Sequence, residues 1–203
     1  DLQHAILQTL AYHALFEFPL TREEITRGLI HAERVSEEDI DRALEQLIPA
    51  RLLRMEGFIV EKGYEHFVHL RKERYREAEK KFRKALRFVR VCRFLPFVRM
   101  IAISNTLGYS NARAASDIDF FIIAAAGHLW TARFFVTGLA ALLHLRPTAF
   151  VRKNQLCLCF YHSTDHLSLE SFAIPDDIYL PHWITQLYPL YDAGNDYERF
   201  WNA

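Results

Sequence analysis

The sequence lacks the features that mark membrane, disulfide-rich and strongly charged proteins. Its 203 residues carry 25 basic and 25 acidic side chains, so net charge provides no general attraction to nucleic acid or to a membrane surface. Its three cysteines form no even framework and no Cys-x-x-Cys pair, which indicates a reducing compartment. No apolar run approaches the length of about eighteen residues that a membrane span needs. We therefore expect a cytoplasmic protein that makes no contact with a membrane.

Several familiar catalytic motifs are also absent. The sequence contains no P-loop, no Gly-x-Ser-x-Gly and no His-Glu-x-x-His. Cys157 and Cys159, with His162 and His166, do not match the usual zinc-ligand spacings. Two cysteines on one face of a buried strand are more often small core residues. We therefore expect both cysteines in the core.

The first 70 residues have the pattern of three helices followed by a β-hairpin. The expected helices cover residues 2–16, 22–30 and 37–48, and the expected strands cover 52–55 and 58–60. Thr21 with Glu24 has the spacing of a capping box, and Ser36 is the expected cap of the third helix. This order of elements is typical of a winged-helix module.

Winged helices often bind DNA through the third helix, which enters the major groove. Here that helix is strongly acidic, and only Arg42 opposes its carboxylates. The acidic residues are Glu37, Glu38, Asp39, Asp41 and Glu45. Because affinity for DNA depends on neutralising phosphates, this helix is poorly suited to a DNA groove. We expect the module to contact proteins, and a DNA-binding regulator is the less favoured alternative.

Residues 71–93 form a long basic helix, ended by Leu95-Pro96. Its expected apolar stripe consists of Tyr75, Ala78, Phe82, Ala85, Leu86 and Val89. The basic face either contacts a nucleic-acid acceptor or nucleotide phosphates, or is a solvated face that balances the acidic third helix. We favour the second interpretation.

The chemistry of the chain is concentrated after this helix. An apolar strand over 98–103 leads into a loop of small polar residues, and Asp117 and Asp119 begin a second apolar strand. Residues two apart in a strand point to the same face, so the two carboxylates are expected to lie together. Their mutual repulsion is relieved by a divalent cation, and carboxylate oxygens suit Mg²⁺. The pattern predicts that these residues bind Mg²⁺ or Mn²⁺.

This arrangement of strand, small-residue turn, spacer and Asp-x-Asp resembles the polymerase-beta-like nucleotidyltransferases. The segment Ser116-Asp117-Ile118-Asp119-Phe120 is similar to the Ser-Asp-Ile-Asp form of the small bacterial members. The resemblance implies transfer of a nucleoside monophosphate from a metal-bound NTP to an acceptor hydroxyl on a protein, an RNA or a small molecule.

The resemblance also implies an α+β fold in three parts. A winged-helix-like module covers residues 1–70, a basic connecting helix covers 71–97, and a minimal nucleotidyltransferase core covers 98–203. The core is expected to be a short mixed β-sheet with flanking helices. Apolar patterns predict its third strand over 155–162 and helices over 128–145 and 175–187, with Pro189 ending the last helix.

In the family, the two carboxylates bind the metal and take part in catalysis, which the resemblance assigns here to Asp117 and Asp119. The Gly-Ser of the family's turn falls on Asn105 and Thr106, which are expected to hold phosphate oxygens. The other candidate nucleotide-binding residues are Ser104, Ser116, Arg133 and Lys153.

Two departures from the family pattern leave an alternative function open. Asn105 has a side chain where glycine allows a close approach of the backbone, although Asn tolerates the left-handed conformation. The third strand carries Cys157 and Cys159, but no acid, where the family has a third carboxylate, and Glu170 in a following short strand is the candidate substitute. The alternative is a catalytically degenerate domain that acts as a nucleotide-binding or antitoxin-like interaction module.

Overall fold

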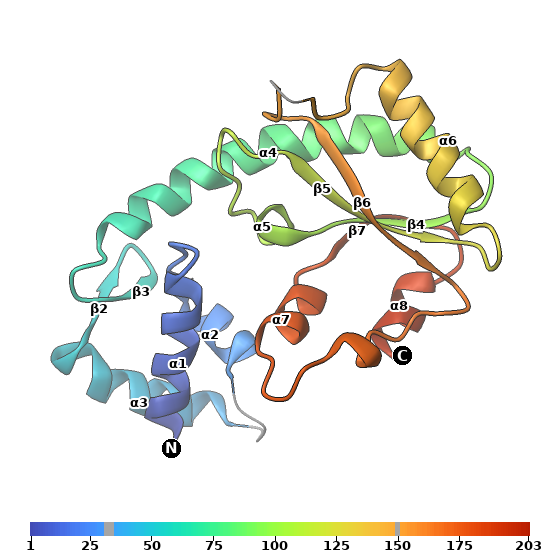
Figure 1. Ribbon diagram of the computed structural model, residues 1–203. Helices are drawn as coiled ribbons and strands as arrows, with labels where there is room; N and C mark the ends of the chain where they lie inside the picture. Colours follow the sequence, from blue (N-terminus) through green and yellow to red (C-terminus); the bar gives the residue numbers. More distant parts are fainter. Residues whose placement is uncertain (31–34, 149–150) are drawn as a thin grey trace. The chain divides into compact units, whose positions relative to one another are not determined.

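The chain has a mixed α+β structure that divides into two compact units. Figure 1 shows the computed structural model, which describes residues 1–30, 35–148 and 151–203. The units are Asp1–Glu73 and Arg74–Ala203, and the boundary falls within the long helix α4 (His66–Cys92). Among the described helices, none combines the length and the apolar character that crossing a membrane requires.

The first unit combines three helices with a small antiparallel sheet. Its helices are α1 (Leu2–Ala14), α2 (Arg22–Gly28) and α3 (Glu37–Ala50), and its strands are β1 (Leu20–Thr21), β2 (Leu52–Met55) and β3 (Phe58–Glu61). The strand order is β1-β3-β2, with both pairs antiparallel. The predicted hairpin is confirmed, whereas the two-residue strand β1 was not predicted.

Both predicted helix caps are present. They could be predicted because each depends only on residues close in the sequence. The Thr21 side chain accepts a hydrogen bond from the Glu24 amide, and the Glu24 carboxylate accepts one from the Thr21 amide at 2.8 Å. Ser36 caps α3 by accepting from the Asp39 amide. These contacts satisfy amides at the helix starts that have no partner within the helix.

The Glu24 carboxylate also anchors the beginning of α4. The Arg71 guanidinium donates to its two oxygens at 2.7 and 2.6 Å, and lies over the rings of Phe18 and Phe58. The acidic face of α3 is partly paired within the first unit. Glu37 and Asp41 form ion pairs with Arg22 of α2.

Helix α4 is longer than predicted, and its buried stripe agrees only in part with the prediction. It begins at His66 and therefore includes residues that we assigned to the winged-helix module. From residue 74 onward its buried positions are Arg74, Ala78, Lys81, Ala85, Phe88, Val89 and Cys92. Except for Val89, they are spaced alternately by four and three residues, which matches one helix face. Tyr75 and Leu86, which we placed on the buried stripe, are 55% and 37% exposed.

The second unit is built on a four-stranded mixed sheet with strand order β6-β5-β4-β7. The strands are β4 (Val98–Ile103), β5 (Ile118–Ala124), β6 (Leu156–Ser163) and β7 (Tyr188–Asp192). Strands β5 and β6 are parallel and are joined through α6 (Leu129–Leu142), while β4 pairs antiparallel with both of its neighbours.

Strand β7 corrects the prediction for the C-terminal region. Pro189 does not end a long helix but lies inside β7, opposite Ala102. Proline is tolerated there because β7 is an edge strand, where an amide can be missing without breaking a second ladder. The helix expected over 175–187 is only α7 (Tyr179–Thr185).

The two faces of this sheet have separate cores. Ile118, Phe120 and Ile122 pack with residues of α4 and α6 on one face. Phe121 and Ile123 pack with Trp183 of α7 and with α8 (Asp196–Trp201) on the other (Figure 1). Because side chains alternate along a strand, Asp119 belongs to the α7 face.

Candidate functional site

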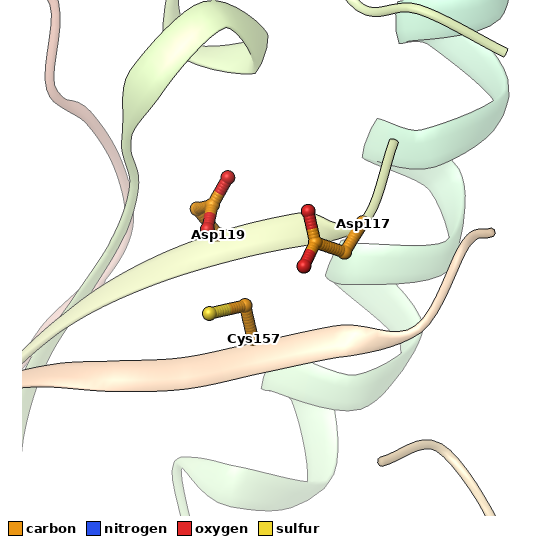
Figure 2. Close-up of side chains that lie close together, drawn as sticks. All are labelled: Asp117, Asp119 and Cys157. Atoms are coloured by element: carbon orange, nitrogen blue, oxygen red, sulfur yellow. The ribbon is translucent and has the colours of Figure 1, made fainter. Parts of the chain in front are cut away.

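Asp117, Asp119 and Cys157 form a cluster where β5 and β6 begin. One ligand atom from each residue lies within 4.8 Å of those from the other two (Figure 2). Asp119 and Cys157 are directly paired across the parallel strands. Asp117 precedes β5 rather than lying in it, which corrects the prediction that both aspartates are strand residues. The structure thus brings the two predicted carboxylates together and adds a thiol.

The environment of Asp119 disfavours its charged form. Burial raises the pKa of its carboxyl group, and the nearby charge of Asp117 raises it further. Hydrogen bonds from Asn105 and Cys157 oppose this rise, but the net pKa remains above the ordinary aspartate value. A divalent cation between the carboxylates would remove the repulsion and favour ionisation of both groups.

The cysteines of β6 do not behave as core residues, contrary to our expectation. Cys159 is exposed and Cys157 is half-buried. Their Sγ atoms are 3.3 Å apart. Burial, Cys159 and Asp119 all raise the pKa of the Cys157 thiol. The pairing of β5 with β6 shifts register beyond Asp119, and this irregularity interrupts the alternation on which the prediction depended.

Asn105 supports the cluster from the turn that follows β4. Its φ of 55° lies in the left-handed region that Asn tolerates. Its Oδ1 accepts a hydrogen bond of 2.9 Å from Trp183 Nε1, and its side chain also bonds to Asp119. The amide is therefore already engaged with a carboxylate and an indole.

The turn itself is the short helix α5 (Asn105–Gly108), packed closely against the chain that follows α7. A Cβ on Gly108 would lie 2.2 Å from the Gln186 carbonyl oxygen, so only glycine fits without a shift of the backbone. Thr106 is half-buried in this turn, and its carbonyl accepts from the Asn111 amide at 2.7 Å. Ser104 is buried just before it.

A cavity of about 330 Å³ opens beside the cluster. Asp119, Asn105 and Cys157 provide polar groups on its wall, and the aromatic rings come from Phe160, Tyr179 and Trp183. This volume lies in the range of small-molecule sites. Aromatic faces next to carboxylates can hold a planar ring while the acids hold a metal.

A second network holds the chain segments that enter β5 and β6. The buried Lys81 ammonium group donates to the Ser116 carbonyl at 2.6 Å and to Asn154 Oδ1 at 2.8 Å. The Asn154 amide donates to the same Ser116 carbonyl at 3.0 Å, and Lys84 donates to the Asn154 carbonyl at 2.5 Å. Because Ser116 precedes Asp117, this network fixes the backbone next to the cluster of Asp117, Asp119 and Cys157.

Three of the predicted site residues lie away from the cluster. Arg133 belongs to α6, and its guanidinium lies over the rings of Trp130 and Tyr161 on the other face of the sheet. Lys153 is exposed in the loop before β6. Glu170 is exposed in a short 3-10 helix (Glu170–Phe172), not in the strand that we expected, and it lines a different cavity.

Sequence reasoning missed Trp183 and Lys81 as parts of this site, and it placed Cys157 at the position of the family's third carboxylate without making it a ligand. The register that places Cys157 opposite Asp119 and the turn that brings Trp183 to Asn105 are long-range features without a local signal. Lys81 did have a signal, because it continues the alternating spacing of four and three residues between Ala78 and Ala85.

Comparisons of the chain with family models, with curated proteins and with solved structures find no match in any of the three. The site is therefore interpreted from its own geometry.

Proposed function

We propose that the chain is a metal-dependent nucleotidyltransferase of the polymerase-beta-like type, located in the cytoplasm. It transfers a nucleoside monophosphate from an NTP to an acceptor hydroxyl. The observation that carries this proposal is the convergence of Asp117, Asp119 and Cys157 next to the turn of α5. The same proposal interprets the second unit as a minimal nucleotidyltransferase core and the first as a winged-helix module.

The donor groups fit Mg²⁺ or Mn²⁺. Asp117 and Asp119 offer hard oxygen ligands, which both ions prefer, and the softer Cys157 thiol favours Mn²⁺. A bound metal would offset the charge that develops on the phosphate oxygens. Asn105 would keep the Asp119 carboxylate oriented, and the rings of Tyr179 and Trp183 would bind the planar base.

The turn around α5 is the proposed position of the phosphates. Ser104, Asn105 and Thr106 lie at its start, and Ser104 and Asn105 line the cavity that contains Asp119. The triphosphate would therefore lie between this turn and the metal. Arg133 is not needed in this arrangement, because it stacks on rings of the opposite face.

A catalytically degenerate, nucleotide-binding or antitoxin-like module is the second candidate, and a specific observation favours it. The Asn105 amide is committed to Asp119 and Trp183, where glycine would leave room for a phosphate. The third group of the cluster is a thiol whose raised pKa keeps it protonated, so it cannot accept the proton of an attacking hydroxyl. This candidate binds nucleotides and releases no pyrophosphate.

A DNA-binding regulator is the least supported alternative. Three helices with an antiparallel three-stranded sheet support a winged-helix interpretation of the first unit. However, α3 carries five carboxylates, and the ion pairs of Glu37 and Asp41 with Arg22 offset only part of this negative charge. A protein partner fits this surface better than DNA does.

The test is incubation with each labelled NTP and Mg²⁺ or Mn²⁺, following pyrophosphate release and transfer of label to the protein or to added acceptors. Asp117→Asn and Asp119→Asn should abolish transfer. Asp176→Asn is the matched control, because Asp176 is exposed and has a φ of 60° that Asn tolerates. Nucleotide binding without transfer would favour the degenerate module, and full activity of Asp119→Asn would contradict both.

A further inference from the structure

A second cavity, of about 390 Å³, lies on the face of the sheet opposite Asp119. Its polar wall consists of Lys81, Lys84 and Arg87 from α4, with Asn154 from the loop before β6. Its apolar wall includes Phe88, Leu143 and Leu145. The cavity thus places cationic groups on one side of a hydrophobic pocket.

The positive charge in this cavity is not balanced by acids. Lys81 and Lys84 donate to carbonyl and amide oxygens, which are neutral, and Arg87 donates to the Arg83 carbonyl. Among the residues that the structure describes, no carboxylate lies within ion-pair distance of these three cations. The fourth cation of the wall, Lys80, is paired with Glu77.

The lack of an ion pair is unusual at Lys81, because this residue is only 1% exposed. A buried ammonium group that forms no ion pair is costly. Burial therefore lowers the pKa of Lys81, and the more distant charges of Glu77 and Asp117 offset this only in part. An anion in the cavity would supply the missing charge. Two further cations within the same wall favour an anion that carries more than one negative charge.

We propose that this cavity binds an organic phosphate. The phosphate group is held by Lys81, Lys84 and Arg87, and an apolar or aromatic group of the same ligand packs on Phe88, Leu143 and Leu145. A cavity of about 390 Å³ is larger than inorganic phosphate needs and falls in the range of small-molecule sites. Asp117 and Asp119 do not line the cavity, so this site is separate from the proposed transferase site, although Lys81 also holds the Ser116 carbonyl next to Asp117.

The experiment measures binding of phenyl phosphate, inorganic phosphate and benzyl alcohol by titration calorimetry. Phenyl phosphate combines both required groups and should bind more tightly than either of the other probes. Lys84→Gln combined with Arg87→Gln should weaken its binding by about tenfold or more, because charge-assisted hydrogen bonds are lost. Neither residue is fully buried, so both changes are compatible with folding.

Two controls separate this site from general attraction to a basic helix and from the candidate transferase site. Arg90→Gln removes one exposed charge from the same helix outside the cavity and should change the affinity less than about twofold. Asp119→Asn should leave phenyl phosphate binding unchanged. Equal weakening by Arg90→Gln, equal affinity for the three probes, or no detectable binding of phenyl phosphate would each overturn the proposal.

Discussion

Glu24 in the first unit and Asp119 in the second are both half-buried carboxylates, but their surroundings have opposite effects. Burial raises the pKa of both groups. At Glu24, the Arg71 guanidinium and the Thr21 amide outweigh burial and lower the pKa. At Asp119, the neighbouring Asp117 adds to the effect of burial and the pKa stays raised.

The difference separates a carboxylate that is neutralised within the fold from one that has no cation beside it among the described residues. The Glu24 carboxylate accepts hydrogen bonds from the Thr21 amide and the Arg71 guanidinium, and two aromatic rings pack against that guanidinium. Its negative charge is therefore balanced within the first unit. Asp119 faces another carboxylate and a thiol, an arrangement that costs stability unless a ligand is bound. Such perturbed, unpaired groups are characteristic of functional sites.

The largest expected effect comes from removing the structural partner. Arg71→Ala should lower the free energy of unfolding of the first unit by about 2 kcal/mol, because it leaves Glu24 without its charged hydrogen bonds. Urea unfolding checks this value. Arg42→Ala, which removes an exposed arginine paired with Asp39, is the matched control and should have little effect.

This loss should also depend on pH in a defined direction. The folded-state pKa of Glu24 is below its unfolded value, so its stabilising contribution is complete above the unfolded pKa. The contribution is lost as the pH falls through the folded pKa. The difference between wild type and Arg71→Ala should therefore shrink in acid. A difference that stays constant down to the lowest pH would show that packing on Phe18 and Phe58 dominates.

The next effect concerns the third ligand. Cys157→Asp adds a hard ligand opposite Asp119 and should raise the affinity for Mg²⁺ by roughly tenfold, measured without nucleotide. The wild type should prefer Mn²⁺, and Cys157→Ser should reduce that preference. Cys159→Ser keeps all three groups of the cluster and changes only a neighbour of the Cys157 thiol, so it should alter metal affinity less than Cys157→Ser does. Equal metal binding by wild type and both Cys157 variants would remove the thiol from the site.

Whether a structural feature could be predicted from the sequence depends on how far apart along the chain its interacting residues lie. The caps at Thr21 and Ser36 and the pairing of two aspartates are local, and the sequence pattern was sufficient for them. The stripe predicted for α4 was right only in part, because Tyr75 and Leu86 fit a helical period but are exposed, while its other four positions are buried or half-buried. A period identifies a stripe only when its buried neighbours are known.

The parts that were missed depend on contacts between distant segments. Pro189 is accepted in β7 because β7 lies at the edge of the sheet. The residues around Pro189 in the sequence do not reveal this edge position. Cys157 reaches the site through a strand register, and Trp183 through a hydrogen bond to a residue 78 positions away. Position within the sheet, not residue type, decides these roles.

A smaller effect is expected from neutralising the Asp119 carboxylate. Without metal, Asp119→Asn should raise the unfolding midpoint by a few degrees, because it removes a buried charge that Asp117 repels. The folded-state pKa of Asp119 exceeds its unfolded value of about 3.9. Ionisation therefore costs stability as the pH rises through the folded pKa, and the variant should gain nothing at lower pH. Asp176→Asn should show no such gain in a thermal unfolding series across pH.

The smallest effect should follow from Asn105→Gly, which tests whether the amide blocks the phosphate position. Glycine adopts the φ of 55° readily, so little backbone strain is expected. The variant frees Trp183 Nε1 and one side of Asp119, and its tryptophan emission should shift as the indole loses its partner. If the amide occupies the phosphate position, nucleotide affinity should rise a few-fold. A fall in affinity would instead show that Asn105 serves the site by orienting Asp119.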